Sequence, residues 1–323
     1  MDKVGGRKGV WHFEVRRNLH IFAAETKHRT MEETTRRDGK GRDVALVLSS
    51  GGARGYAHIG AIEELEARGY RIRSVTGCSM GALVGGLYAS GHLKELKEWV
   101  LSINRRKILS LTDVSMSVSH LVKGERIIQE LNKIVPDCRI EDMSIPFRAV
   151  ATDLRRQREV VFDRGSLYAA IRASISIPTY YDPLRTRKML LVDGGITNPL
   201  PLNRAPRTEG DLLVAVNVSA PFSEEEEEKR RRARRLAERG GIFARVFRGS
   251  DEEAVNYYSL LNATIHTQIQ QLARMQLRLT PPDVVVNVPM NRFWGLGYDR
   301  AARIIGEGRE LMRRALEGTA SDK

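Results

Sequence analysis

The sequence predicts an α/β fold with three layers, in which helices cover both faces of a mainly parallel central sheet. Short continuous apolar runs predict the strands, because a strand buried on both faces shows no polar alternation. VALVL, at Val44–Leu48, is the first of these runs. Segments with helical spacing of apolar residues separate many of the runs, and strands that alternate with helices form parallel sheets.

Length and composition fit a globular protein without a membrane-spanning segment. The chain has 323 residues, 41% of them hydrophobic, which suits one large domain or two small ones. It contains no run of about 18 apolar residues, and its basic N-terminus lacks the apolar stretch of a secretory signal. Two cysteines, Cys78 and Cys138, cannot build a disulfide framework and indicate free thiols in a reducing compartment. We therefore expect a cytoplasmic location.

The formal net charge of +13 bears on partners rather than on fold. A basic surface suits nucleic acid, an anionic membrane or simple solvation. The chain has neither zinc-finger spacing nor the aromatic run of an RNA-recognition motif, so we expect no nucleic-acid partner. Peripheral contact with an anionic membrane remains as an expectation, beside a merely solvated basic face.

The first predicted unit consists of a strand, a loop, a helix and a second strand. Val44–Leu48 leads into the glycine-rich loop SGGARG, at Ser50–Gly55. Helical spacing follows and ends at Gly69, in the position of a helix-terminating glycine. RIRSVT, at Arg71–Thr76, is the next strand. A unit of this order implies two parallel strands joined by a right-handed crossover.

A second helix and further strands continue the α/β pattern. The helix is predicted after TGCSMG, running to Ala89 and stopping at Gly91. Apolar runs predict further strands at Phe147–Ala151, Glu159–Phe162, Met189–Val192, Leu212–Val218 and Val284–Val288.

The chain divides into four predicted parts. Residues 1–42 form a basic appendage, either a membrane-surface or partner-binding arm or a loosely docked tail. Residues 43–220 form the core, 221–280 a helical excursion, and 281–323 a C-terminal strand and helix that complete the core. Within the excursion, EEEEEKRRRARR at Glu224–Arg235 places several glutamates four residues before a lysine or arginine. This spacing predicts an exposed helix, with a basic lipid-facing patch as the alternative.

Ser79 occupies the centre of a G-x-S-x-G motif, between Gly77 and Gly81. A strand precedes the motif and a helix follows it, which is the context that a nucleophile on a sharp turn requires. Glycines at both flanks allow the turn to pack tightly, since a Cβ there would clash with the neighbouring strand and helix. The motif alone leaves two alternatives open, a nucleophile and a structural serine.

The glycine-rich loop and one aspartate add further chemistry. SGGARG lets backbone N–H groups converge on a negative charge, either a phosphate or the oxyanion of an acyl intermediate. The loop lacks the G-K-[ST] ending of a phosphate-binding P-loop. Asp193 follows an apolar strand and precedes Gly194 and Gly195. It is therefore expected at the end of its strand, as Ser79 and the glycine-rich loop are at the ends of theirs.

If Ser79 is a nucleophile, it needs a base that accepts the proton of its hydroxyl. A triad of the α/β-hydrolase type needs a histidine after the acid, and only His266 follows Asp193. His266 lies in a helical stretch, LLNATIHTQIQQL, which is poor context for a triad member. Asp193 itself is therefore the expected base, and burial would raise its basicity above that of an ordinary carboxylate.

Several segments in order resemble one known family. SGGARGYAHIGAIEELEARG, GCSMG and DGGITNPLP resemble the patatin-like phospholipases, which are serine lipid acyl hydrolases with a Ser–Asp dyad. IRASISIP and ATDL fit the same family, and PDVVVNVP with FWGLGYDRAARIIGEG resembles the end of its bacterial members. The family loop usually opens with a third glycine, where this chain has Ser50.

The resemblance implies roles for particular residues. Ser79 would be the nucleophile, Asp193 the general base, and Arg54 the basic residue of the loop. The oxyanion hole would come from the backbone of Gly51, Gly52, Ala53, Arg54 and Gly55, the nucleophile elbow from Gly77 and Gly81, and the base loop from Gly194 and Gly195.

The implied activity is hydrolysis of fatty acyl esters of phospholipids or lysophospholipids through an acyl-enzyme, with neither a metal nor a cofactor. Two alternatives stay open. One is an α/β hydrolase with a Ser–Asp–His triad, and the other is a non-catalytic protein that uses the patatin fold for lipid binding or as a scaffold. The motifs predict no oligomeric state.

Overall fold

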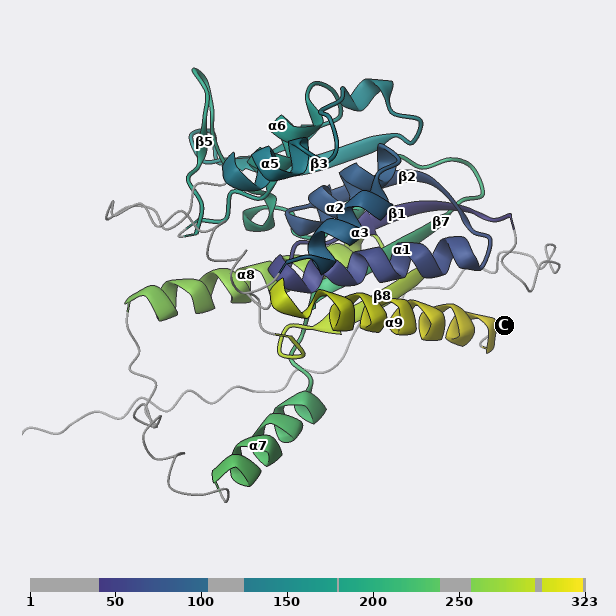
Figure 1. The fold of residues 1–323 in the computed structure, drawn as a ribbon, viewed down its shortest axis with the longest axis vertical. Helices are drawn as coiled ribbons and strands as arrows, with labels where there is room; N and C mark the ends of the chain where they lie inside the picture. Colours follow the sequence, from purple (N-terminus) through teal and green to yellow (C-terminus); the bar gives the residue numbers. More distant parts are fainter. Residues whose placement is uncertain (1–40, 104–124, 179, 239–256, 294–297, 322–323) are drawn as a thin grey trace, which may run out of the picture. The chain divides into compact units, whose positions relative to one another are not determined.

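The computed structural model describes residues 41–103, 125–178, 180–238, 257–293 and 298–321 (Figure 1). The expected N-terminal appendage, residues 1–42, falls almost wholly outside the described residues. Along the described ranges, the order of strands and helices follows the α/β alternation that the sequence predicts.

An eight-stranded sheet forms the centre of the described fold, in the order β5-β6-β3-β2-β1-β7-β8, with β4 beside β3. Parallel pairing joins β3, β2, β1, β7 and β8. The strands are β1 (Asp43–Leu48), β2 (Arg71–Cys78), β3 (Phe147–Asp153), β4 (Arg158–Phe162), β5 (Leu184–Arg185), β6 (Leu190–Asp193), β7 (Leu212–Ala220) and β8 (Val284–Pro289).

One side of the sheet is antiparallel, so the sheet as a whole is mixed. Strands β4 and β6 both pair antiparallel with β3, and β5 pairs antiparallel with β6. Short links explain the antiparallel pairing of β4 with β3 and of β5 with β6, because neither link leaves room for a crossover helix. The predicted α/β fold is confirmed, and its parallel character holds for the five strands around β1.

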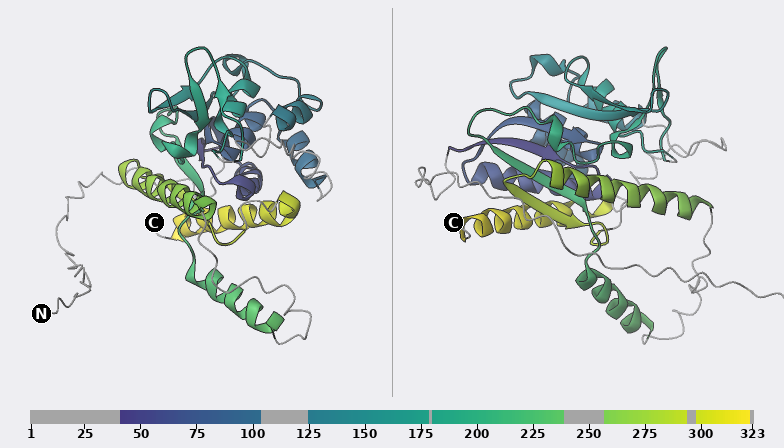
Figure 2. Two further views of the ribbon diagram at one scale, coloured as in Figure 1. Left: turned by 90° about the vertical axis from the view of Figure 1, so that its left-hand side faces the viewer. Right: turned by 180° about the vertical axis from the view of Figure 1, so that it is seen from behind.

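Helices cover both faces of the sheet, as Figures 1 and 2 show from opposite sides. Helices α1, α2 and α9 pack on the face that carries Val44, Leu46 and Leu48. Helix α8 covers the opposite face over β7, where Ala273 meets Ala45 and Val47. The helices are α1 (Ala57–Ala67), α2 (Met80–Ala89), α3 (Leu93–Leu101), α5 (Glu125–Asn132), α6 (Leu167–Ser174), α7 (Glu224–Glu238), α8 (Tyr257–Leu279) and α9 (Ala301–Ser321).

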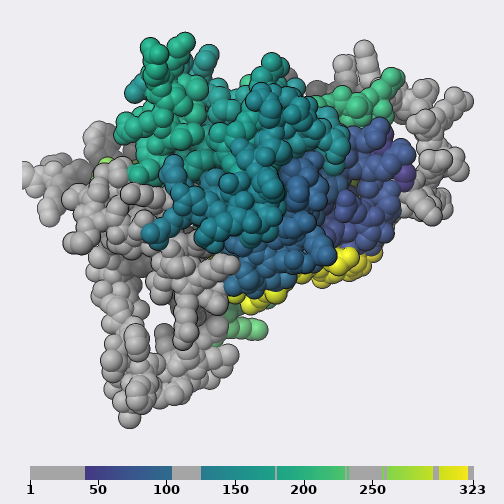
Figure 3. Space-filling model, turned by 45° about the horizontal axis from the view of Figure 1, so that its top comes forward, coloured from purple at the N-terminus to yellow at the C-terminus, as the bar shows by residue number. Residues whose placement is uncertain are grey.

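Predicted helix ends match the structure where glycine sets them. Gly69 follows α1 with a φ of 78°, and Gly91 follows α2 with a φ of 85°, a region of backbone space that favours glycine. The space-filling view in Figure 3 shows the surface of residues 125–200 (teal) beside that of residues 70–103 (blue), with α9 (yellow) along the lower edge. No helix in the described ranges is long and apolar enough to cross a membrane.

Helix α7 carries the charge pattern that the sequence predicts. Lys229 bonds Glu225 at 2.7 Å and Arg231 approaches Glu227 to 3.8 Å, each pair four residues apart. Glu226 differs, because it pairs at 3.2 Å with Arg292, beyond β8. This contact ties the first turn of α7 to the segment that follows the sheet.

Candidate active site

Ser79 lies at the junction of β2 and α2 in a backbone conformation that side chains rarely adopt, with φ 55° and ψ −122°. Such a conformation costs of order 1–3 kcal/mol and persists only where its surroundings enforce it. Here a Cβ on Gly77 would come within 2.3 Å of the Gly81 carbonyl oxygen. A Cβ on Gly81 would come within 2.2 Å of the Leu48 carbonyl oxygen, so both glycines permit the tight turn.

Hydrogen bonds hold the turn in place. The Ser79 carbonyl accepts from the N–H groups of Ala82 and Leu83, at 2.9 and 3.1 Å. The Ser79 N–H donates to the Ser174 hydroxyl at 2.8 Å, and that hydroxyl donates to the Val150 carbonyl at 2.6 Å. Helix α6 therefore fixes the serine from the side, and the sequence offers no local signal for this contact.

Asp193 reaches Ser79 through the register of β3. Cys78 pairs with Val150 on β3, and Asp193 pairs with Ala151, the next residue of that strand. Ser79 and Asp193 therefore stand level on the two sides of β3. Gly194 lets the chain after Asp193 pass close to β3. A Cβ at this position would lie 2.3 Å from the Val150 carbonyl oxygen and 3.0 Å from the Cys78 sulfur.

The Ser79 hydroxyl donates a hydrogen bond to Oδ2 of Asp193. Oδ1 of the same carboxylate accepts from the Gly195 N–H at 2.7 Å and from the Cys78 thiol at 3.9 Å. Burial raises the pKa of Asp193 to about 6, although the hydrogen bonds from Ser79, Gly195 and Cys78 act in the opposite direction. A carboxylate with this pKa is ionised at neutral pH and is a stronger base than an exposed aspartate.

The glycine-rich loop lies beside Ser79, between β1 and α1. Gly51 packs so closely on β7 that an added Cβ would meet Val218 at 2.3 Å. Gly52, with a φ of 57°, begins the short 3₁₀ helix Gly52–Tyr56. Ser50 anchors the loop, because its N–H donates to the Pro199 carbonyl at 2.8 Å and its carbonyl accepts from the Ser219 hydroxyl at 2.7 Å.

Arg54 is buried, with 5% of its surface exposed. Its Nε donates to the Val218 carbonyl at 2.9 Å, and its Nη1 is 3.5 Å from the Met290 carbonyl oxygen. No carboxylate pairs with it in the described residues. Burial lowers the pKa of Arg54 to about 10, which reflects an incompletely compensated charge. The guanidinium therefore has capacity to bind an anion.

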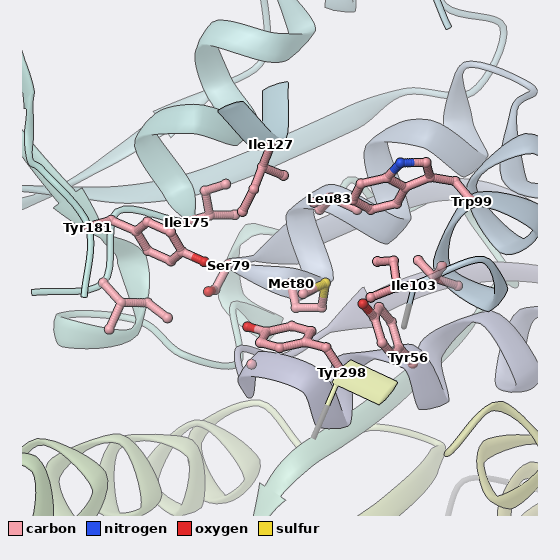
Figure 4. A pocket seen from close by; sticks show the side chains of 13 residues that line it. Tyr56, Ser79, Met80, Leu83, Trp99, Ile103, Ile127, Ile175, Tyr181 and Tyr298 are labelled. Carbon is pink, nitrogen blue, oxygen red and sulfur yellow. The ribbon is translucent and has the colours of Figure 1, made fainter. Parts of the chain in front are cut away.

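An apolar cavity of about 90 Å³ opens on one side of Ser79 (Figure 4). Figure 4 shows Ser79 at its edge, with the hydroxyl ends of Tyr181 and Tyr298 directed toward the serine. The rest of its wall is mainly aliphatic and comes from α2, α3, α5 and neighbouring segments. Its apolar lining includes Leu83, Trp99, Val100, Ile103, Ile127 and Ile175.

A larger and more polar cavity of about 310 Å³, here called the vestibule, opens on the other side of Ser79. The glycine-rich loop, Arg54 and Asp193 form part of its wall, and α8 contributes Asn262 and His266. The two cavities together offer an apolar space and a polar space on either side of one serine hydroxyl.

The other candidate residues take separate places. His266 lines the vestibule, but among the described contacts it makes no hydrogen bond with Ser79 or Asp193. Asp153 caps the turn after β3, accepting from the Arg155 N–H at 3.1 Å and from Arg156 at 2.8 Å. Asp153 therefore has a structural role in this turn.

The chain is similar to known proteins in sequence and in fold. The sequence model of the patatin-like phospholipases matches residues 46–206, which contain Ser79, Asp193 and the glycine-rich loop. An NTE family protein of Mycobacterium tuberculosis is 36% identical over 333 residues, an alignment that covers 86% of this chain and 92% of the relative. The chain belongs to the patatin-like phospholipase family. Membership in the patatin-like phospholipases supports lipid hydrolase activity in general terms.

Two further proteins show how far the similarity extends. The human patatin-like phospholipase domain-containing protein 6 is 33% identical over 187 residues, covering 56% of this chain but 14% of that protein. The crystal structure of VipD from Legionella pneumophila aligns with a TM-score of 0.52 at 15% identity, covering 87% of this chain and 67% of VipD. This second likeness supports the patatin fold.

Ser174, Tyr181 and Tyr298 have no counterpart among the sequence expectations, although each lies at the site. Ser174 and Tyr181 belong to or follow IRASISIP, and Tyr298 belongs to FWGLGYDRAARIIGEG. Both segments resemble the family, which is the one sequence signal that could have drawn attention to them. The residues around each of the three give no local indication that they lie near Ser79.

Proposed function

We propose that this protein hydrolyses fatty acyl esters of phospholipids or lysophospholipids through a Ser79–Asp193 dyad. One observation carries the proposal, namely the hydrogen bond from the Ser79 hydroxyl to a buried carboxylate of raised pKa. A serine is a weak nucleophile until an adjacent base accepts its proton. Among the described residues, Asp193 accepts the hydrogen bond of the Ser79 hydroxyl and is therefore placed to accept its proton.

In the acylation step, Asp193 accepts the hydroxyl proton while Ser79 Oγ bonds to the ester carbonyl carbon. The carbonyl oxygen becomes an oxyanion, for which the backbone N–H groups of the loop from Gly51 to Gly55 would be donors. The intermediate then collapses, the bond from carbon to the alcohol oxygen breaks, and protonated Asp193 returns its proton to the leaving alcohol.

In the deacylation step, water takes the place of the alcohol. Asp193 accepts a proton from the water molecule while the water oxygen bonds to the acyl carbon. Collapse of the second intermediate breaks the bond to Ser79 Oγ, and the proton returns from Asp193 to the serine. The products are the free fatty acid and the original dyad, so no metal or cofactor takes part in the proposed cycle.

The contrast between the two cavities supports a phosphate-bearing lipid. The apolar cavity suits the acyl chain, and the wider vestibule suits the alcohol and its headgroup. Arg54 lines the vestibule as a buried guanidinium without a carboxylate partner in the described residues. A phosphate diester would supply the missing negative charge, whereas a neutral acylglycerol would not.

Contact with an anionic membrane fits the same proposal. Phe222 lines the vestibule with 68% of its surface exposed, and Leu260 on α8 is 56% exposed. Exposed apolar side chains near a substrate cavity, on a chain with a net charge of +13, favour docking on an anionic lipid surface.

Labelling with a fluorophosphonate probe tests the dyad, because the probe reacts with activated serines. Wild type is expected to label and Ser79→Ala is expected not to. Asp193→Asn should label about 100-fold more slowly or worse, the usual contribution of a general base. Equal labelling of wild type and Ser79→Ala, or of wild type and Asp193→Asn, would contradict the proposal.

The same assay separates the two alternatives. If His266 were a triad base, His266→Gln should lose labelling as severely as Asp193→Asn, whereas we expect it to keep most of the wild-type rate. If the protein were a non-catalytic lipid-binding module, wild type should neither label nor release fatty acid from lysophospholipid vesicles.

A further inference from the structure

The residues that line both cavities mark the place of the scissile ester. If the acyl chain occupies the apolar cavity and the headgroup occupies the vestibule, the ester and the next carbon of the alcohol must lie where the two meet. The described residues common to both walls are Gly52, Ser79, Ile177, Tyr181 and Tyr298. Besides Ser79, the polar side chains in this set are the two tyrosines.

Tyr181 and Tyr298 come from distant parts of the chain and are held at this junction by separate contacts. Arg172 on α6 donates to the Asp182 carbonyl at 3.1 Å, which fixes the backbone next to Tyr181. The Tyr298 ring packs edge-on against Tyr56, with ring centroids 5.9 Å apart. Figure 4 shows both phenol oxygens directed toward Ser79.

The two phenols have hydrogen-bonding capacity that they do not use on each other. The two phenol side chains interact with each other. Two hydroxyl groups carry two hydrogens, and a bond between them would use one, so at least one hydrogen remains for another acceptor. Burial raises the pKa of both phenols, so both keep their hydrogens at neutral pH.

An acceptor at this point belongs to the alcohol part of the substrate. The oxyanion faces the glycine-rich loop in the proposed mechanism, and the acyl chain has no oxygen beyond its carbonyl. In a glycerolipid acylated at an end carbon of glycerol, the central carbon, which is bonded to the esterified carbon, carries either a hydroxyl or a second ester. That oxygen is the substrate group that a donor at the junction would meet.

We propose that Tyr181 and Tyr298 are substrate-positioning residues that bind the oxygen on the glycerol carbon next to the esterified carbon. The inference rests on the proposed function and deepens it by naming the part of the alcohol that the enzyme recognises. It makes the enzyme selective for glycerolipids over simple alkyl esters of the same acyl chain.

A pair of matched substrates tests this role. One is a 1-acyl lysophosphatidylcholine, and the other is its 2-deoxy analogue with the same acyl chain and headgroup. For wild type, kcat/KM is expected to favour the hydroxylated substrate about three- to tenfold, the usual value of one hydrogen bond. In Tyr181→Phe and in Tyr298→Phe this ratio should fall toward one. Because both substrates are measured on one preparation, the ratio does not depend on the fraction of folded enzyme.

Two further tyrosine variants serve as controls. Tyr88→Phe removes a hydroxyl on α2 that donates to Glu66 at 2.8 Å, outside both cavity walls, and should keep the wild-type rates and ratio. Tyr56→Phe removes a hydroxyl from the wall of the apolar cavity alone, so any effect should be equal for the two substrates.

The outcomes separate this inference from the proposed function. If wild type hydrolyses neither substrate and does not label, the proposed function itself is wrong. If wild type hydrolyses both but shows no preference for the hydroxylated substrate, or if both Tyr→Phe variants retain the preference, the positioning role is overturned while the dyad stands.

Discussion

The hydroxyl of Ser79 donates to the carboxylate of Asp193, a residue 114 positions later in the chain. The two meet because β6 runs antiparallel to β3 in a register that brings Asp193 level with the end of β2. The pairing is buried on both sides, with Ser79 3% and Asp193 5% exposed. Burial raises the basicity of the carboxylate and shields the pair from water, so one contact determines both the strength and the position of the proposed base.

Activity should rise with pH as Asp193 ionises. Since burial raises its pKa to about 6, kcat/KM should increase through pH 6 and level off above about pH 7. A pH profile with a short-chain soluble ester measures this without changes in membrane binding. His266→Gln should leave the midpoint in place, and a midpoint that disappears in that variant would identify histidine as the base instead.

Asp193 should lower the stability of the fold at neutral pH. Its pKa is about 6 when folded against an ordinary 3.8, so between these values the folded state binds more protons than the unfolded state. Stability therefore falls as pH rises from about 4 to 6, by about 2–3 kcal/mol in total. Asp193→Asn should raise the melting temperature at pH 8, and this gain should vanish near pH 4. Equal shifts at both pH values would contradict the assignment.

Gly81→Ala should be severely destabilising, because the new methyl would lie 2.2 Å from the Leu48 carbonyl oxygen and backbone must move to admit it. We expect a loss of at least about 3 kcal/mol together with loss of serine labelling. Gly306→Ala is the matched control, because nothing lies within 4 Å of its added Cβ in α9. Alanine there should stabilise the helix by up to about 1 kcal/mol. Urea denaturation of both variants provides the comparison.

Arg54 should determine preference for a charged headgroup. Arg54→Gln removes the buried cation from the vestibule, so the ratio of kcat/KM for lysophospholipid to that for monoacylglycerol should fall about tenfold or more. Both rates should also drop, since Arg54 donates to the Val218 carbonyl and supports the loop. A ratio equal to that of wild type would show that the headgroup does not contact Arg54.

Val100 should set the length of acyl chain that the apolar cavity accepts. Val100→Phe places a larger side chain in the wall of a cavity of about 90 Å³. Long chains should lose about 0.8 kcal/mol for each methylene group left outside, whereas short chains should be little affected. A series of p-nitrophenyl esters measures the profile, and Val285→Phe on the exposed side of β8 is the control. A parallel loss for all chain lengths would contradict this location of the chain.

Much of the site follows from short segments of sequence. The strand and helix on either side of Ser79, the glycine-rich loop after β1 and the strand before Asp193 all lie where local patterns predict them. These signals work because the buried run, the helical spacing and the terminating glycine each depend on neighbours a few residues away. Family resemblance then suggested which of these segments act together.

Other parts depended on contacts between distant segments. The antiparallel placement of β6, the support of Ser79 by Ser174, and the meeting of Tyr181 with Tyr298 have no local signature in the sequence. The sequence by itself determined the turns, the apolar strands and the residue types of a hydrolase site. Tertiary structure alone decided how deeply Asp193 is buried and which residues line the two cavities beside Ser79, because strand register and packing between distant segments set desolvation and cavity shape.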